Sequence, residues 1–207
     1  MLRIVEKTSQ VNLDHDELEV GSRIRELRLE KKFSLRELGA RLGISASALS
    51  QIETGKRRPS VARLHQIVSI LDAPLSAVFG ETTGNTFGTS VELPEGAVVQ
   101  RQNEASELIL EGGVEWLRLS PTPIPGIDLL KVTYPPGGGW DEYLRHNGHE
   151  TAHVLTGTLN FDVGFEHHTL AAGDSISYSS TSPHRIKNPG TEVAVAIWLV
   201  LNTSTAV

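Results

Sequence analysis

Two histidines and a glutamate in the C-terminal half are the side chains best suited to bind a metal ion. His146 and Glu150 lie in the segment HNGHETAHVLTG, and His184 lies in SPHRIKN. Two imidazoles and one carboxylate suit Zn²⁺, Fe²⁺, Mn²⁺, Ni²⁺ or Cu²⁺ and leave coordination positions open for a ligand or water. We expect these three residues to bind a divalent metal, a small-molecule effector, or both. The alternative is a pocket in which they hydrogen-bond only to each other or to an organic effector.

Other histidines of this region are expected to lie outside that site. Neighbouring side chains of a strand point to opposite faces. His149 and His153 therefore face away from Glu150 and are expected to be wall or surface residues. His167 and His168 are expected to be exposed residues of a hairpin.

A second chemistry lies in the N-terminal half, where positive charge is concentrated. The whole chain has a formal net charge of −6, yet residues 20–63 contain 11 Lys and Arg against 4 Asp and Glu. A basic block in an acidic chain indicates that one half faces a polyanion and the other does not.

The expected helix over 45–54 has an outward face of small or hydrogen-bonding residues, none of them acidic, and the basic turn 56–58 follows it directly. A merely solvated helix face would normally mix Lys and Glu, so this pattern favours nucleic-acid contact over the alternative, a plain helical bundle. Base contacts are expected from one set of residues and phosphate contacts from another. The first set is Ser45, Ala46, Ser47, Ser50 and Gln51, and the second is Lys56, Arg57 and Arg58.

The elements that must position these residues differ between the two halves. The first 80 residues show apolar spacing of three to four, a capping box at Ser34–Glu37 and a helix-ending Gly43. Two short helices joined across residues 43–45 predict a helix-turn-helix. In all we expect five helices: one over 20–32, one opened by Ser34, one over 45–54, one opened by Pro59-Ser60, and a short last one over 74–79.

Beyond residue 91 the pattern becomes short strands punctuated by Gly and Pro, which predicts an all-β sandwich or barrel. The fold class is therefore α+β with two domains. We expect an N-terminal arm over 1–19, the helical domain over 20–80, a linker over 81–91 and the β domain over 92–207. Examples of the expected strands are 114–119, 129–134, 152–155, 158–163, 175–178 and 193–201.

The run LGISASALSQIETGKRRPS resembles the signature of XRE-type, lambda-repressor-like DNA-binding domains. The resemblance covers about residues 20–79. It implies that Ala46, Ser47 and Gln51 face the bases, and that Arg28 and Glu53 form an ion pair between helices. Gln51 is the one strong candidate among them for bidentate reading of adenine.

The two segments around the metal-ligating residues resemble the two motifs of cupins, which are small jelly-roll barrels. Glu150 and Gly157 match the acidic ligand and closing glycine of the first motif, and His146 matches its second histidine. His184 and Asn188 match the end of the second motif. The sequence departs from the pattern at Leu144, where metal-binding cupins usually have their first histidine, so a four-ligand site is reduced to three ligands.

The combination of the two domains is similar to a class of bacterial one-component transcription regulators. The resemblance implies a protein that binds double-stranded DNA and whose barrel binds a small-molecule or metal effector that alters operator affinity. One short recognition helix reads few base pairs, so we expect a homodimer on a palindromic operator. Zero Cys, no stretch near ~18 apolar residues and no signal peptide predict a soluble cytoplasmic protein without a membrane segment.

Two other interpretations stay open. The same architecture is similar to a mononuclear non-haem iron epoxidase of a hydroxyalkyl phosphonate, whose metal triad matches His146, Glu150 and His184. A phosphonate pocket requires a cation near the metal, for which Arg145, Arg185 and Lys187 are available. An intact basic DNA face favours the regulator, so we expect no enzyme. The remaining interpretation is a non-catalytic metabolite store or scaffold.

Overall fold

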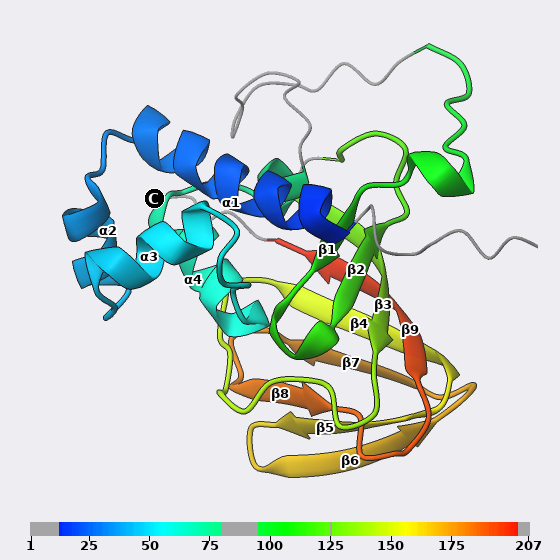
Figure 1. Ribbon diagram of the computed structural model, residues 1–207. Coiled ribbons are helices and arrows are strands. Elements are labelled where there is room, and N and C mark those ends of the chain that lie inside the picture. The colour runs from blue at the N-terminus through cyan, green and yellow to red at the C-terminus, as the bar shows by residue number, and fades with distance from the viewer. Residues whose placement is uncertain (1–12, 80–94, 125, 203–207) are drawn as a thin grey trace, which may run out of the picture.

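The computed structural model describes residues 13–79, 95–124 and 126–202 of the chain. A helical domain lies against a β barrel made of two sheets, with the helices at one end of the barrel (Figure 1). The expected linker over 81–91 falls outside the described residues.

In the described part of the helical domain there are four α-helices and one short 3-10 helix, so the prediction of five helices is corrected in its last member. The elements are α1 (Leu13–Glu30), α2 (Leu35–Arg41), α3 (Ala46–Glu53), α4 (Val61–Ile70) and the 3-10 helix η1 (Leu75–Phe79). None of the helices in the described ranges is both long and apolar enough to cross a membrane.

The start of α1 is also corrected. The predicted arm over 1–19 is helical from Leu13 onward, and residues 1–12 lie outside the described part of the chain. The apolar pattern from Val20 missed this first part of the helix, which is acidic at Asp14, Asp16 and Glu17.

Local capping interactions define the ends of α2 and α3 and form the helix-turn-helix, as predicted. The Ser34 hydroxyl accepts a hydrogen bond from the Glu37 N–H at 3.1 Å, and the Ser34 N–H donates to the Glu37 carboxylate at 2.8 Å. Gly43 has φ of +67°, a conformation that favours glycine, and it ends α2. The Ser45 hydroxyl then caps α3 by accepting from the Ala48 N–H at 3.0 Å.

A buried ion pair connects α1 to α3, which confirms what the resemblance implied. The Arg28 guanidinium donates to both carboxylate oxygens of Glu53, at 2.6 and 2.8 Å, and to the Phe33 carbonyl at 2.8 Å. Both side chains are at least nine-tenths buried. Such a pair fixes the relative orientation of the two helices, because separating them would leave both buried charges unpaired.

We predict that Glu53→Ala lowers the free energy of unfolding by about 3–5 kcal/mol, because it leaves the Arg28 charge buried and unpaired. The measurement is urea unfolding followed by circular dichroism. The matched control is Glu26→Ala, which removes an exposed partner of Arg23 and is expected to cost under about 1 kcal/mol. Equal losses in the two variants would contradict a structural role for the buried pair.

The β domain consists of a six-stranded sheet, in the order β1-β2-β3-β9-β4-β7, facing a three-stranded sheet in the order β6-β5-β8. All pairs within the two sheets are antiparallel. The strands are β1 (Glu107–Ile109), β2 (Glu115–Arg118), β3 (Ile127–Tyr134), β4 (His149–Thr156), β5 (Thr158–Val163), β6 (Glu166–Ala171), β7 (Ser175–Ser179), β8 (His184–Lys187) and β9 (Ala194–Leu201).

The six strands named from the sequence are present, with ends shifted by a few residues, and β1, β6 and β8 were not among them. In β3 and β9 buried and partly exposed residues alternate, so one face of each strand lines the barrel interior. Gly157 lies between β4 and β5 with φ of +74°, and an added Cβ would lie 2.8 Å from Ala194, which explains why this position takes glycine.

Candidate functional site

The predicted base-contacting face of α3 is open to solvent. In Figure 1, α2 and α3 lie on the side of the helical domain that is remote from the barrel. Ser45, Ser47 and Gln51 are exposed, and Ala46 and Ser50 are partly exposed. The opposite face of α3 is buried through Leu49 and Ile52. This face of α3 can therefore enter a DNA groove without unfolding the domain.

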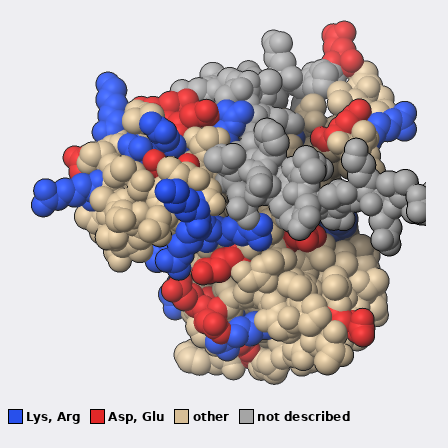
Figure 2. Space-filling view, in the orientation of Figure 1, with Lys and Arg blue, Asp and Glu red and all other residues tan. Residues whose placement is uncertain are grey.

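The basic turn lies next to α3. Lys56 and Arg57 are exposed, and Arg58 is partly exposed. Figure 2 shows Lys and Arg side chains gathered over the helical domain, while most of the visible barrel surface is neither acidic nor basic. Arg57 lies 3.5 Å from the Glu111 carboxylate of the barrel, but both side chains are more than half exposed. Such an exposed pair contributes little stability and leaves Arg57 able to turn toward phosphate.

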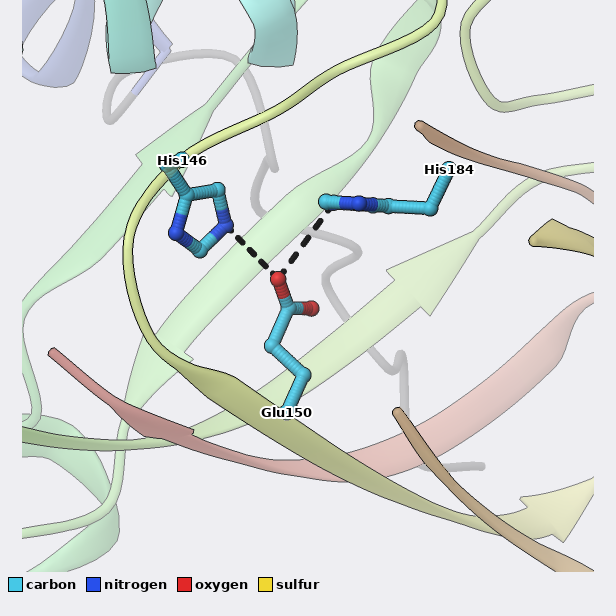
Figure 3. Close-up of side chains that lie close together, drawn as sticks. All are labelled: His146, Glu150 and His184. Carbon is cyan, nitrogen blue, oxygen red and sulfur yellow. Dashed lines mark hydrogen bonds and ion pairs between the residues drawn. The ribbon is translucent and has the colours of Figure 1, made fainter. Parts of the chain in front are cut away.

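The three predicted metal-ligating residues meet inside the barrel. His146 precedes β4, Glu150 lies on β4 and His184 opens β8, so the two sheets bring the three together. Their ligand atoms lie within 4.8 Å of one another. Figure 3 shows the Glu150 carboxylate between the two imidazole rings. The Glu150 Oε1 atom lies 2.7 Å from His146 Nε2 and 3.3 Å from His184 Nε2.

The hydrogen bonds of the two histidines fix which nitrogens face the site. His146 Nδ1 lies 3.2 Å from the Asn147 carbonyl, and His184 Nδ1 lies 2.9 Å from the Ser182 carbonyl. A carbonyl only accepts, so each Nδ1 carries a hydrogen and each neutral ring has its lone pair on Nε2. Both lone pairs then face the same carboxylate oxygen. Either additional protons or one cation among the three atoms must relieve this repulsion.

A metal ion fits this arrangement better than protons alone. The Nε2 atom of His184 is buried, and its 3.3 Å contact with Glu150 lacks hydrogen-bond geometry, so it has no hydrogen-bond partner among the described residues. Metal-ligating histidines typically donate their other ring N–H to a backbone carbonyl, as both rings do here. The three residues can therefore hold one divalent ion through His146 Nε2, Glu150 Oε1 and His184 Nε2.

Glu150 is held in place by three donors that the sequence did not reveal. Its Oε2 atom accepts from the Tyr178 hydroxyl at 2.8 Å and from Trp198 Nε1 at 2.7 Å, and Oε1 accepts from the Ser180 hydroxyl at 3.0 Å. Burial alone would raise the pKa of Glu150. The hydrogen bond with His146 and the charges of His146 and His184 outweigh burial and hold that pKa well below its ordinary value. The carboxylate is therefore ionised and points Oε1 at the histidines.

The pocket around this triad has walls from both domains. Its barrel walls are mostly aromatic and aliphatic, whereas Val61 and His65 of α4 and Leu75 of η1 come from the helical domain. The cavity volume is about 20 Å³, enough for a metal ion or a water molecule, which needs roughly 10–15 Å³. The barrel residues are Trp116, Leu130, Val132, Tyr134, Trp140, Leu144, Glu150, His184, Trp198 and Val200.

The contact of His65 with the triad could not be expected from the sequence. Its ring stacks on that of His146, with centroids 4.6 Å apart and planes 16° apart, and meets Trp116 edge-on at 5.8 Å. Burial lowers the pKa of His65 to about 3, and the charges of His146 and His184 act in the same direction. The His65 imidazole is therefore neutral at neutral pH, and its flat ring packs against the His146 ring of the triad.

Predictions for the other histidines are confirmed. His149 and His153 are exposed on the outer face of β4, where they hydrogen-bond to Ser177 and Ser175 at 3.0 and 2.8 Å. The paired histidines at 167–168 are exposed in the β5–β6 hairpin.

The basic residues considered for a phosphonate pocket do not line the cavity. Arg185 pairs with Asp162 at 2.6 Å, and Lys187 pairs with Asp141. Both lie on the face of β8 opposite the buried His184. Arg145 is exposed. Among the described residues the cavity therefore has no Lys or Arg in its wall.

Leu144 lines the same cavity and pairs with His184 through backbone hydrogen bonds of 2.9 Å in both directions. We predict that Leu144→His adds a fourth ligand and raises zinc affinity about 10-fold or more, since a supporting interaction alone changes affinity by about 10–100-fold. Competition with a chromophoric chelator measures the change. Leu144→Met is the control for altered packing, and equal zinc affinity in both variants would contradict the placement of this residue.

Comparisons with known proteins support the assignment of both domains. Residues 24–78 match the helix-turn-helix family and residues 130–200 match the cupin domain family. The HTH-type transcriptional regulator PuuR of Escherichia coli (strain K12) is 28% identical over 169 residues, which cover 81% of this chain and 86% of PuuR.

A solved structure shows the same fold. The crystal structure of an HTH_3 family transcriptional regulator from Vibrio cholerae superimposes with a TM-score of 0.65 at 22% identity, covering 92% of this chain and 98% of that chain. The crystal structure of FeII HppE gives a TM-score of 0.47 at 20% identity, covering 90% of this chain and 100% of that one, a likeness too weak to assign function. The chain is an XRE-like helix-turn-helix protein with a C-terminal cupin domain.

Proposed function

We propose that the protein is a sequence-specific DNA-binding transcriptional regulator of the cytoplasm, whose cupin barrel binds an effector that changes its affinity for an operator. The observation that carries this proposal is the combination of an exposed, non-acidic face on α3 with a basic turn directly after it. The transcriptional regulators among its relatives support it.

DNA recognition is assigned to residues of α3 and the turn that follows. Gln51 reads adenine through its amide, while Ser47 and Ala46 allow close approach of the helix to the base edges. Lys56, Arg57 and Arg58 bind phosphates beside the groove and set the salt dependence of binding. Ser45 and Ser50 complete the contact surface.

The effector site is assigned to the pocket around His146, Glu150 and His184. His146, Glu150 and His184 would hold one divalent transition metal, Zn²⁺, Fe²⁺, Mn²⁺, Ni²⁺ or Cu²⁺. Such an ion would supply open coordination positions for the effector. Glu150 is positioned for this by its three hydrogen-bond donors.

The functional unit is a homodimer on a palindromic site. One α3 helix covers only a few base pairs, and two copies about 34 Å apart read two half-sites on the same side of the duplex. Catalysis on a phosphonate is disfavoured as an alternative, because the cavity wall carries no described cation to bind the phosphonate group.

A gel shift with the DNA upstream of the protein's own gene tests the proposal. Wild type is expected to prefer this DNA over a scrambled fragment. Gln51→Ala is expected to lose about 10-fold or more of that preference, since a bidentate base contact discriminates by about 1–3 kcal/mol. The matched control is Gln66→Ala, an exposed glutamine on α4. Equal preference in both variants would contradict the role of Gln51.

A further inference from the structure

The helical domain forms one wall of the effector pocket. Val61 and His65 of α4 and Leu75 of η1 line the cavity together with the barrel residues. His65 packs directly on His146 at 4.6 Å between ring centroids. The pocket is therefore complete only when the two domains are docked.

The docked pocket is too small for an organic molecule. Its volume of about 20 Å³ holds a metal ion or a water molecule. The space that an organic effector needs next to His146 is filled by the His65 ring. We propose that α4 and η1 lift away from the barrel when an organic effector enters, so that the bound effector and the docked helical domain exclude each other.

The cavity wall indicates the chemistry of that effector. All three tryptophans of the chain line it, with aliphatic side chains between them. Trp140 is buried, and its Nε1–H has no hydrogen-bond partner among the described residues. The pocket fits a small molecule with an apolar or aromatic body, an acceptor for the Trp140 N–H and a group that approaches the triad.

Lifting α4 moves the recognition helix with it. The Arg63 guanidinium of α4 donates to the Leu42 carbonyl at the end of α2 at 2.5 Å, and Arg57 N–H donates to the Gln51 carbonyl of α3 at 3.1 Å. Leu64 of α4 and Leu49 of α3 are fully buried. In the proposed homodimer, release of this unit changes the spacing of the two α3 helices; this consequence rests on the proposed function.

The contact between the turn after α3 and residue 111 of the β domain offers a way to clamp the docked state. Arg57 and Glu111 face each other across the domain boundary with their charged ends 3.5 Å apart, and the Glu111 N–H donates to the Pro59 carbonyl at 3.0 Å. Both side chains are exposed and the chain has no native cysteine. Arg57→Cys with Glu111→Cys can therefore be joined by a short bis-maleimide.

The test adds Val132→Cys, a buried residue of the pocket wall. After the exposed pair is cross-linked, N-ethylmaleimide serves as the organic probe, and mass spectrometry follows its addition to residue 132. The clamp is expected to slow this alkylation at least 10-fold relative to the protein without cross-link. The control clamp joins Asp141→Cys to Lys187→Cys, an ion pair within the barrel, and is expected to leave the rate unchanged.

Two results would overturn the inference. One is equal alkylation with and without the domain clamp. The other is no alkylation of the unclamped protein over days when the same protein in urea reacts fully. The measurement uses no DNA, so a failure of the proposed regulatory function in the gel shift is a separate outcome and leaves this result unaffected.

Discussion

Replacing Lys56, Arg57 and Arg58 together by alanine is expected to weaken DNA binding by about 100-fold at 0.1 M salt. Each phosphate contact releases condensed counterions, so the slope of log K against log salt concentration should fall by about 0.9 for each lost contact. The loss should be nearly the same for the operator and for a scrambled fragment, because phosphate contacts carry no sequence information. Fluorescence anisotropy at several salt concentrations measures both quantities.

The matched control removes the same charge from the barrel. Arg101→Ala, Lys131→Ala and Lys187→Ala change the net charge equally but lie in the β domain and not in α3 or the turn after it. Their affinity and salt slope should stay within about twofold of the wild type. If both triple variants lose the same affinity, overall charge rather than the basic turn attracts the DNA.

Replacing His184 by alanine is expected to remove bound metal. The wild type, supplied with the metals in turn, should hold about one equivalent of one of them per chain, and His184→Ala should hold less than about a tenth. Loss of a direct ligand exceeds the 10–100-fold affinity cost of losing a supporting one. Elemental analysis of dialysed protein gives the stoichiometry.

His153→Ala is the control for this experiment. His153 lies on the outer face of β4 and hydrogen-bonds to Ser175, so its loss should leave the metal content unchanged. A wild type that keeps less than about a tenth of an equivalent of any supplied metal would contradict the metal site. The barrel pocket would then bind an organic effector through the same residues.

The helical domain could be predicted from the sequence because its signals are local. A capping serine interacts with a residue three positions away, as Ser34 does with Glu37 and Ser45 does with Ala48. The first part of α1 was missed because its sequence, LDHDELE, contains few apolar residues to form a stripe. A helical segment that lacks an amphipathic pattern is difficult to recognise in a single sequence.

The barrel was predicted less completely, since its strands pair over long separations. Strand β6 reads EHHTLA and buries only Leu170, so it shows no alternation. Strand β8 has four residues and is recognised only by its pairing with β5.

The ligand triad was predicted from residue types and a resemblance, but its surroundings were not. Trp198 donates to Glu150 because β9 lies beside β4, which no spacing in the sequence reveals. Nothing in the sequence around His65 distinguishes it from other positions of α4. Its contact with His146 depends on how the two domains dock, and the sequence pattern of either domain does not reveal this.

Selection of binding sites from random-sequence DNA tests the central claim most directly. If α3 reads bases as part of a homodimer, wild-type protein should enrich one palindromic sequence with half-sites about one helical turn apart. Gln51→Ala should enrich a sequence with relaxed preference at one position of each half-site. Recovery of DNA with no shared sequence, at any salt concentration that permits binding, would contradict a sequence-specific regulator.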